Sequence, residues 1–242
     1  MTKSEFFFKY IYRLKPVEYP NPNGTLPKSV LMMAPHTSFM DFIIGLSAMS
    51  YYDLHASTII KKEIFVFPLN LILKKLGGIP VDRKHARNFV SYAADIIKKR
   101  DRITLIICPE GTRKRVEKWK RGFYQIAMEA GVPISLGYID YKTRTCGIMS
   151  IFEPTGDYEK DLQEIQAQYY GLEGYHKGQF NLEDKPHAHP EWYNLSYFRN
   201  GGFQYANHFV DLLVAEVVID WQTDFACILA ISIGIVLDVE SQ

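Results

Sequence analysis

Short apolar runs alternate with helical segments through the first half of the chain, and this alternation limits the folds that the chain can adopt. Strands that are separated by helices form parallel sheets with helices packed on their faces. We therefore expect an α/β fold with a mainly parallel or mixed sheet flanked by helices. The expected strands cover residues 29–34, 57–60, 79–82 and 103–108, and the expected helices cover residues 39–52, 65–76 and 86–100.

Further along the chain, the pattern predicts a hairpin between two helices. Residues 133–141 and 145–152 are apolar, and Tyr141-Lys142-Thr143-Arg144 joins them as a turn. The flanking helices are predicted over residues 119–130 and 157–169. From about residue 181 the composition changes, because His, Pro and aromatic residues crowd together without periodicity. These observations predict one domain over residues 25–180 and an extension of unknown role over residues 181–242.

The N-terminal residues 4–14 combine aromatic and basic side chains and are predicted to be helical. Such a segment can lie in a membrane interface with its rings at headgroup depth, or it can pack on the domain as an ordinary helix. It is too short to span a bilayer, which takes about 20 apolar residues. We expect residues 1–24 to form an N-terminal interfacial helix and loop.

The net charge of +1 conceals a strong asymmetry between the two halves. Residues 1–122 hold 22 Lys and Arg against 10 Asp and Glu, whereas residues 123–242 hold 6 against 17. A basic half suits the phosphates of a substrate or of anionic lipid, or the two halves neutralise each other in the fold. Six of the basic residues lie within residues 113–121, beside Trp119. They could meet phosphates or anionic lipid headgroups, or form a solvated face.

Several classes of site are disfavoured by the residues present. Cys108, Cys146 and Cys227 are widely spaced, so they predict neither a disulfide framework nor a C-x-x-C metal site. His187 and His189 lack further ligands at usable spacing, and we expect no metal there. The basic run comes without a recognised nucleic-acid motif, so nucleic acid is not an expected partner.

The most chemically suggestive stretch follows the first expected strand. His36 lies just past that strand, and Asp41 follows in the first turn of the next helix. Imidazole is the usual general base for activating a hydroxyl, and a carboxylate on its second nitrogen fixes the tautomer. Alternatively, Asp41 caps the helix together with Ser38, and His36 is an ordinary loop residue.

Further chemical groups also follow expected strands. Arg83 comes after one strand and Glu110 after another. Because the carboxyl ends of parallel strands meet at one edge of a sheet, we expect these groups and His36 to emerge on one rim. Arginine can bind a phosphate bidentately, so Arg83 and Arg113 are candidates for binding a phosphorylated ligand.

Four blocks stand in order along the chain, and they are His36-Thr-Ser-Phe-Met-Asp41, Gly77-Gly-Ile-Pro-Val-Asp-Arg83, Pro109-Glu-Gly-Thr-Arg113 and Val132-Pro-Ile134. Together and in this order they resemble the motifs of the glycerolipid acyltransferase family, whose best-known members acylate lysophosphatidate. Pro35 before His36, and Cys108, Lys114 and Leu136, depart from common residues of the family. The resemblance covers about residues 25–155.

The resemblance implies a glycerol-phosphate acyltransferase-like fold and a role for each motif residue. His36 and Asp41 match the catalytic pair, and Arg83 matches the arginine assigned to the phosphate of the acceptor. The remaining matches, at positions that bind the acceptor or belong to the fourth block, are Glu110, Gly111, Thr112, Arg113 and Pro133.

The implied activity is the transfer of a fatty acyl group from acyl-CoA or acyl carrier protein to a lysophospholipid hydroxyl, in phospholipid biosynthesis. It needs no cofactor, and it places the protein peripherally on the cytoplasmic face of an anionic membrane. The oxyanion of the reaction could be met by backbone N–H groups near His36 or in the Gly111 turn. Open alternatives are a phosphate-free acceptor such as an N-acyl amino-acid lipid, a hydrolase, and a non-catalytic membrane-binding scaffold.

Overall fold

The computed structural model describes residues 3–21, 23–81 and 89–186 of the chain. These residues belong to one compact unit, and a second unit that begins at residue 194 lies outside them. The extension predicted from residue 181 therefore falls mostly outside the described residues, as do Cys227, His187, His189 and Arg83. Among the described residues, every helix is too short or too polar to cross a bilayer.

The strands form one mixed sheet in the described part of the chain. They are β1 (Lys15–Pro16), β2 (Lys28–Met33), β3 (Ala56–Lys61), β4 (Gly78–Val81), β5 (Ile103–Ile107), β6 (Ile134–Asp140) and β7 (Thr145–Phe152). Their order in the sheet is β1-β7-β6-β2-β5-β3-β4. The central strands run parallel, whereas β7 pairs antiparallel with β6 and β1 runs parallel to β7. The predicted α/β fold with a mixed sheet is confirmed, including the hairpin.

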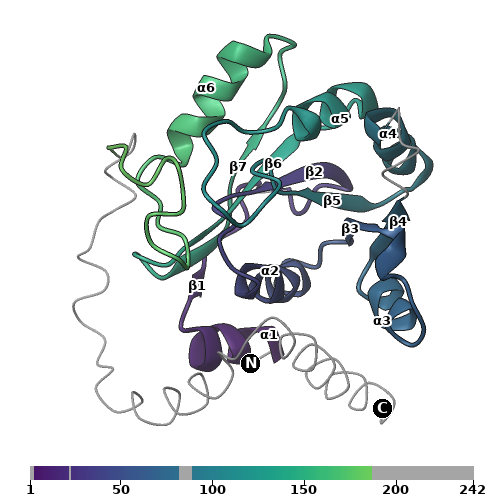
Figure 1. Cartoon of the computed structure of the whole chain (residues 1–242), viewed down its shortest axis with the longest axis horizontal. Coiled ribbons are helices and arrows are strands. Elements are labelled where there is room, and N and C mark those ends of the chain that lie inside the picture. The colour runs from purple at the N-terminus through teal and green to yellow at the C-terminus, as the bar shows by residue number, and fades with distance from the viewer. Residues whose placement is uncertain (1–2, 22, 82–88, 187–242) are drawn as a thin grey trace. The chain divides into compact units, whose positions relative to one another are not determined.

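Helices cover both faces of this sheet (Figure 1). They are α1 (Lys3–Phe6), the π-helical η1 (Phe7–Tyr12), α2 (Met40–Tyr51), the 3₁₀ turn η2 (Lys62–Ile64), α3 (Leu69–Lys75), α4 (Phe89–Lys99), α5 (Gly122–Ala130) and α6 (Tyr158–Gln168). Along the chain, β2, β3 and β4 step toward one edge of the sheet, and β5 and β6 step back. Because parallel crossovers are right-handed, α2 and α3 lie on one face and α4 and α5 lie on the other.

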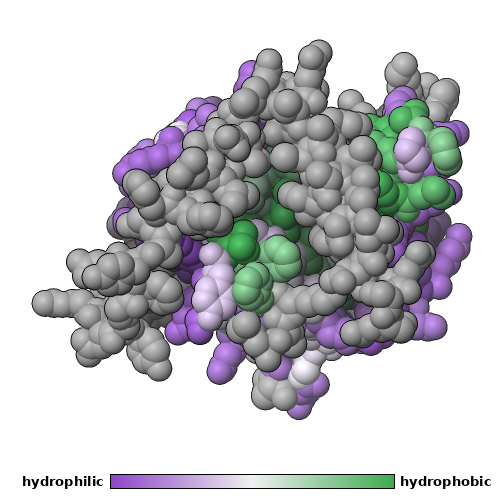
Figure 2. All heavy atoms as spheres, turned by 90° about the horizontal axis from the view of Figure 1, so that it is seen from below, coloured by the Kyte–Doolittle hydropathy of each residue, from purple (hydrophilic) through white to green (hydrophobic). Residues whose placement is uncertain are grey.

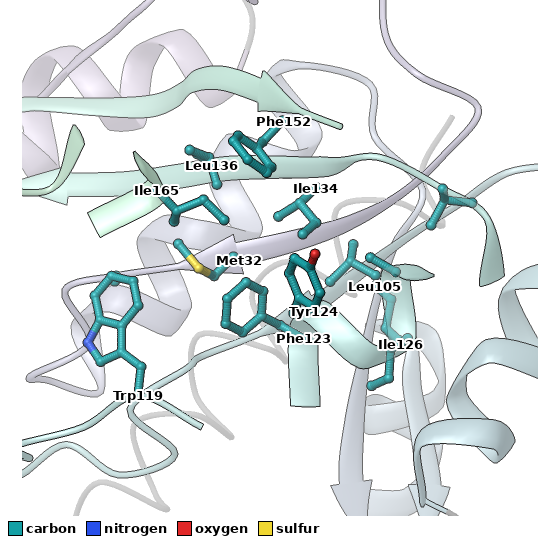
Figure 3. Close-up of a cluster of buried hydrophobic side chains, with 14 of the residues drawn as sticks. Met32, Leu105, Trp119, Phe123, Tyr124, Ile126, Ile134, Leu136, Phe152 and Ile165 are labelled. Atoms are coloured by element: carbon teal, nitrogen blue, oxygen red, sulfur yellow. The ribbon is translucent and has the colours of Figure 1, made fainter. Parts of the chain in front are cut away.

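Each face of the sheet buries its own apolar cluster. On one face, side chains of β2, β5 and β6 pack against α5 and α6, which Figure 3 shows. On the other face, Leu31 and Ile148 pack against α2, and Phe8 of η1 packs beneath them. Fully burying such a side chain stabilises the fold by about 1.5–3 kcal/mol. The chain can therefore hold the ends of β2 and β5, from which the candidate site emerges, on a rigid base.

Several expected elements differ in their bounds. The helix expected over residues 65–76 covers Leu69–Lys75, because it begins after Pro68. The helix predicted from residue 119 begins at Gly122, because the backbone N–H of Lys120 donates to the Pro109 carbonyl (2.8 Å). Trp119 is buried against Tyr169, with ring centroids 5.5 Å apart, so it is not available to a lipid surface. The helix and loop expected over residues 1–24 also contain β1, which is too short to show a periodicity.

The glycines at 77 and 78 end α3 as the sequence predicts. Gly77 has φ of +77°, a left-handed conformation that glycine adopts without strain. A Cβ on Gly77 would also lie 2.2 Å from the carbonyl oxygen of Ala56 in β3. The helix must therefore stop at this point, which sends the chain back into the sheet as β4.

Candidate functional site

The candidate site lies at the carboxyl ends of β2 and β5. His36 follows β2 in a short loop that leads into α2, and its side chain is 23% exposed. Asp41 lies in the first turn of α2 and its side chain is 3% exposed. The Nδ1 atom of His36 lies 3.5 Å from Oδ2 of Asp41. The ring therefore presents Nδ1 to the carboxylate and keeps Nε2 for a reactant.

Asp41 is fixed from several directions. Its Oδ2 accepts hydrogen bonds from the backbone N–H groups of Thr37 and Ser38, both at 2.8 Å. Its Oδ1 accepts a hydrogen bond from the hydroxyl of Tyr141, also at 2.8 Å. A buried carboxylate is costly unless it is hydrogen-bonded, and these three donors meet that need. Asp41 thus accepts from Ser38, as in a capping box, although Phe39 at the start of α2 has no side-chain cap, and the same carboxylate faces His36.

Tyr141 is a site residue that the sequence did not reveal. It begins the turn between β6 and β7, and it lies 100 positions after Asp41. Burial first, and then the nearby Asp41 charge, raise the pKa of the Tyr141 hydroxyl above its usual range. The hydroxyl therefore stays protonated near neutral pH and donates to Asp41. Only the pairing of β6 with β2 could have indicated this contact.

Glu110 lies beneath the His36 loop. It follows β5, it is 4% exposed, and its Oε2 accepts a hydrogen bond from the backbone N–H of His36 (2.9 Å). Burial, opposed by the hydrogen bond from His36 and aided by the charge of Asp41, raises the pKa of Glu110 to about 8. Burial and the charges of both carboxylates also raise the pKa of Cys108 to about 12. Cys108 therefore stays a thiol, unsuited to act as a nucleophile.

The substitution Glu110→Gln should change the pH dependence of stability. Because its pKa in the folded protein lies above the ordinary value of 4.5, Glu110 contributes stability below that value, and the contribution is lost as the pH rises through about 8. Glutamine keeps the acceptor without the charge. We expect the free energy of unfolding of the wild type to fall relative to the variant by about 2–4 kcal/mol between these pH values, measured by urea unfolding. A difference that does not change with pH would contradict this assignment.

A segment that follows α6 packs against the His36 loop. The backbone N–H of His176 donates to Oγ1 of Thr37 (3.1 Å), and a Cβ on Gly174 would lie 2.6 Å from the Thr37 side chain. The ring of Tyr175 stacks edge-on against that of Tyr141. Residues 173–176 therefore hold the loop and the carboxylate contacts in place, although they carry no motif that would have marked them.

The backbone N–H groups that were expected to stabilise the oxyanion, near His36 and in the Gly111 turn, already donate to acceptors within the protein. The N–H of His36 donates to Glu110, and the Gly111 N–H donates to the carbonyl of Cys108 (3.1 Å). The N–H groups of Thr37 and Ser38 donate to Asp41, as described above. A reacting oxyanion at this rim would therefore have to displace one of these bonds or use donors further along the Gly111 turn.

The remaining motif residues differ in their positions. Gly111 has φ of +66°, and a Cβ there would lie 2.5 Å from Nζ of Lys120, so the lysine side chain covers this turn. Thr112 accepts a hydrogen bond from the backbone N–H of Lys114, and Arg113 follows it, half-buried. These residues share the rim with His36. Pro133 does not share this rim. It precedes β6, and its carbonyl accepts a hydrogen bond from the backbone N–H of Val30, so it lies toward the amino-terminal ends of the parallel strands.

The basic run over residues 113–121 is partly engaged within the protein. Arg115 donates to the carbonyls of Gly178 (2.9 Å) and Phe180 (3.0 Å). Arg121 pairs with Glu159 and lies over the ring of Tyr158, 4.4 Å from its centroid. These two arginines therefore stabilise contacts with the segments around α6. In the described residues, no cluster of three or more His, Cys, Asp and Glu side chains is arranged to hold a metal ion.

Comparisons with known proteins identify a matching family and a similar solved structure. Residues 18–135 match the model of the family described as Acyltransferase. Among solved structures, the chain is similar to the 1-acyl-sn-glycerophosphate (LPA) acyltransferase PlsC from Thermotoga maritima, at 21% sequence identity and a TM-score of 0.47. That similarity covers 68% of this chain and 74% of the other. A comparison with curated proteins found no match.

Proposed function

Because residues 18–135 match the model of the acyltransferase family, we propose that this chain moves a fatty acyl group from an acyl thioester to the hydroxyl of a lysophospholipid. An acceptor such as 1-acylglycerol 3-phosphate fits best, which gives the protein a role in phospholipid biosynthesis. The donor is acyl-CoA or acyl carrier protein. The observation that carries this proposal is the partly exposed His36 ring, whose Nδ1 faces the buried, triply hydrogen-bonded carboxylate of Asp41.

The proposed reaction begins with proton transfer. Nε2 of His36 takes the proton of the acceptor hydroxyl as its oxygen attacks the carbonyl carbon of the thioester, and Asp41 stabilises the imidazolium that forms. The tetrahedral oxyanion then collapses and the C–S bond breaks. The leaving thiolate takes the proton back from His36, so the enzyme returns to its starting state. No covalent acyl-enzyme is needed.

Acceptor binding is proposed for the turn that follows β5. Arg113 can hold the phosphate of the acceptor, with Gly111 and Thr112 shaping the turn, and Glu110 fixes the adjoining His36 loop. Arg83, which lies outside the described residues, is proposed as a second phosphate ligand from its motif alone. Holding the acceptor by its phosphate brings its hydroxyl to the imidazole and so removes much of the entropic barrier.

The place of action proposed for the protein is the cytoplasmic face of an anionic membrane, where it binds peripherally. Lysophospholipid acceptors reside in membranes, and the aromatic and basic side chains of α1 and η1 suit the headgroup region. The side chains of Phe6, Phe7, Tyr10 and Ile11 are exposed there, and Lys9 lies over the ring of Tyr10.

The test of the proposal is an acceptor panel. Purified full-length protein would be given acyl-CoA or acyl carrier protein with lysophosphatidate, other lysophospholipids, or phosphate-free N-acyl amino-acid lipids, and the lipid products identified by mass. We expect acylated phospholipid with lysophosphatidate among the preferred acceptors. Acylation of phosphate-free acceptors alone, or release of free fatty acid without acylated lipid, would overturn the proposal.

A further inference from the structure

A group of large apolar side chains projects into solvent around the start of α3. Phe67 is 81% exposed, Leu71 59%, Val66 58% and Ile64 40%. We refer to these four residues as the α3 tip. A single exposed apolar residue is ordinary, but a contiguous exposed group marks an interaction surface.

The α3 tip is accompanied by basic side chains. Lys62 precedes it in η2, and Lys74 and Lys75 form the last turn of α3, all of them exposed. Glu63 is the acidic residue beside them. Aromatic and aliphatic side chains bordered by lysines match the headgroup region of an anionic bilayer, where rings enter the interface and ammonium groups meet lipid phosphates.

The position of α3 in the fold aligns this surface with the N-terminal segment. The crossovers place α2 and α3 on the same face of the sheet. The N-terminal segment packs on the outside of α2, because Phe8 is buried against that helix and the hydroxyl of Tyr12 is hydrogen-bonded to that of Ser47 (3.0 Å). Figure 2 shows this face from below, with apolar side chains gathered over α3 at its right.

We propose that the α3 tip enters an anionic bilayer and forms a second membrane contact beside the exposed side chains of α1 and η1. The occupant is a lipid surface and not a protein partner, because the tip continues the face that already carries the N-terminal aromatic residues, and because lysines border it. This inference rests on the proposed function, since it specifies how the enzyme meets the membrane that supplies its acceptor.

Vesicle binding by the full-length protein tests the inference. With vesicles of phosphatidylcholine and phosphatidylglycerol, Phe67→Ser should weaken binding roughly tenfold, because the exposed ring would no longer be buried on binding. Phe67→Trp should retain binding, because tryptophan also prefers the interface. The matched control is Met128→Ser, which removes an exposed apolar side chain of α5 on the opposite face and should bind as the wild type does.

The role of the lysines is tested with the same vesicles. Lys74→Glu combined with Lys75→Glu should abolish most of the difference between vesicles with and without phosphatidylglycerol. Wild-type binding by Phe67→Ser, or a wild-type protein that binds neither vesicle, would overturn the inference. So would self-association that Phe67→Ser abolishes while vesicle binding is unchanged. Since vesicle binding requires no turnover, failure of the acyl-transfer proposal would appear only in the acceptor panel.

Discussion

The substitution His36→Ala is expected to lower kcat for acyl transfer by about 10³-fold, within the range that a positioned general base contributes. The reason is geometric, because His36 presents Nδ1 to Asp41 and leaves Nε2 for the acceptor hydroxyl. The measurement is the rate of thiol release from acyl-CoA in the presence of lysophosphatidate, at saturating concentrations of both substrates.

The fold of the His36→Ala protein should be unchanged, because the ring is partly exposed and Glu110 holds the backbone, not the side chain, of residue 36. Circular dichroism and the midpoint of urea unfolding check this. The control His55→Ala removes the imidazole that precedes β3, at the other end of the sheet, and should leave the rate unchanged. Near-wild-type transfer by His36→Ala would contradict the mechanism.

The substitution Asp41→Asn is expected to have the second large effect, on both activity and stability. Asparagine cannot stabilise the imidazolium, so kcat should fall on the order of 10³–10⁴-fold. Its amide also cannot accept from Thr37, Ser38 and Tyr141 at once, so the free energy of unfolding should fall by about 1–3 kcal/mol. Steady-state kinetics give kcat, and urea unfolding of the same preparation gives the free energy of unfolding.

Tyr141→Phe provides the matched control for Asp41→Asn. It removes one donor to Oδ1 and leaves the carboxylate charge beside His36. Its effect on kcat should therefore be much smaller than that of Asp41→Asn. Equal losses in the two variants would indicate that the position of the carboxylate, and not its charge, is what the reaction requires.

The order of strands and helices could be predicted from the sequence because it depends on local patterns. The apolar run before His36 predicts β2. The glycines after α3 mark the end of that helix and the start of β4. β1 could not be predicted, since it is two residues long and is defined only by its pairing with β7. The burial of Trp119 was hidden by the charged residues around it, because its partner Tyr169 lies 50 positions away in the sequence.

The candidate site was predictable where its residues follow strands. His36 and Glu110 follow β2 and β5, which are neighbours in the sheet, and the structure joins them by a hydrogen bond. The contact of Tyr141 with Asp41 was not predictable, because it depends on how β6 pairs with β2 and on the turn after β6. The motif predicts Pro133 as a site residue. Because β6 runs parallel to β2, however, Pro133 lies at the amino-terminal end of β6, whereas His36 follows the carboxyl end of β2.

The central claim is that His36, oriented by Asp41, takes the proton of an alcohol as that alcohol attacks the carbonyl carbon of a thioester. The most direct measurement follows thiol release and acylated lipid, by mass, in the same reaction with acyl-CoA and lysophosphatidate. We predict equal amounts of both products with the wild type and the loss of both with His36→Ala. Thiol released without acylated lipid, or acylated lipid formed at an undiminished rate by His36→Ala, would contradict the claim.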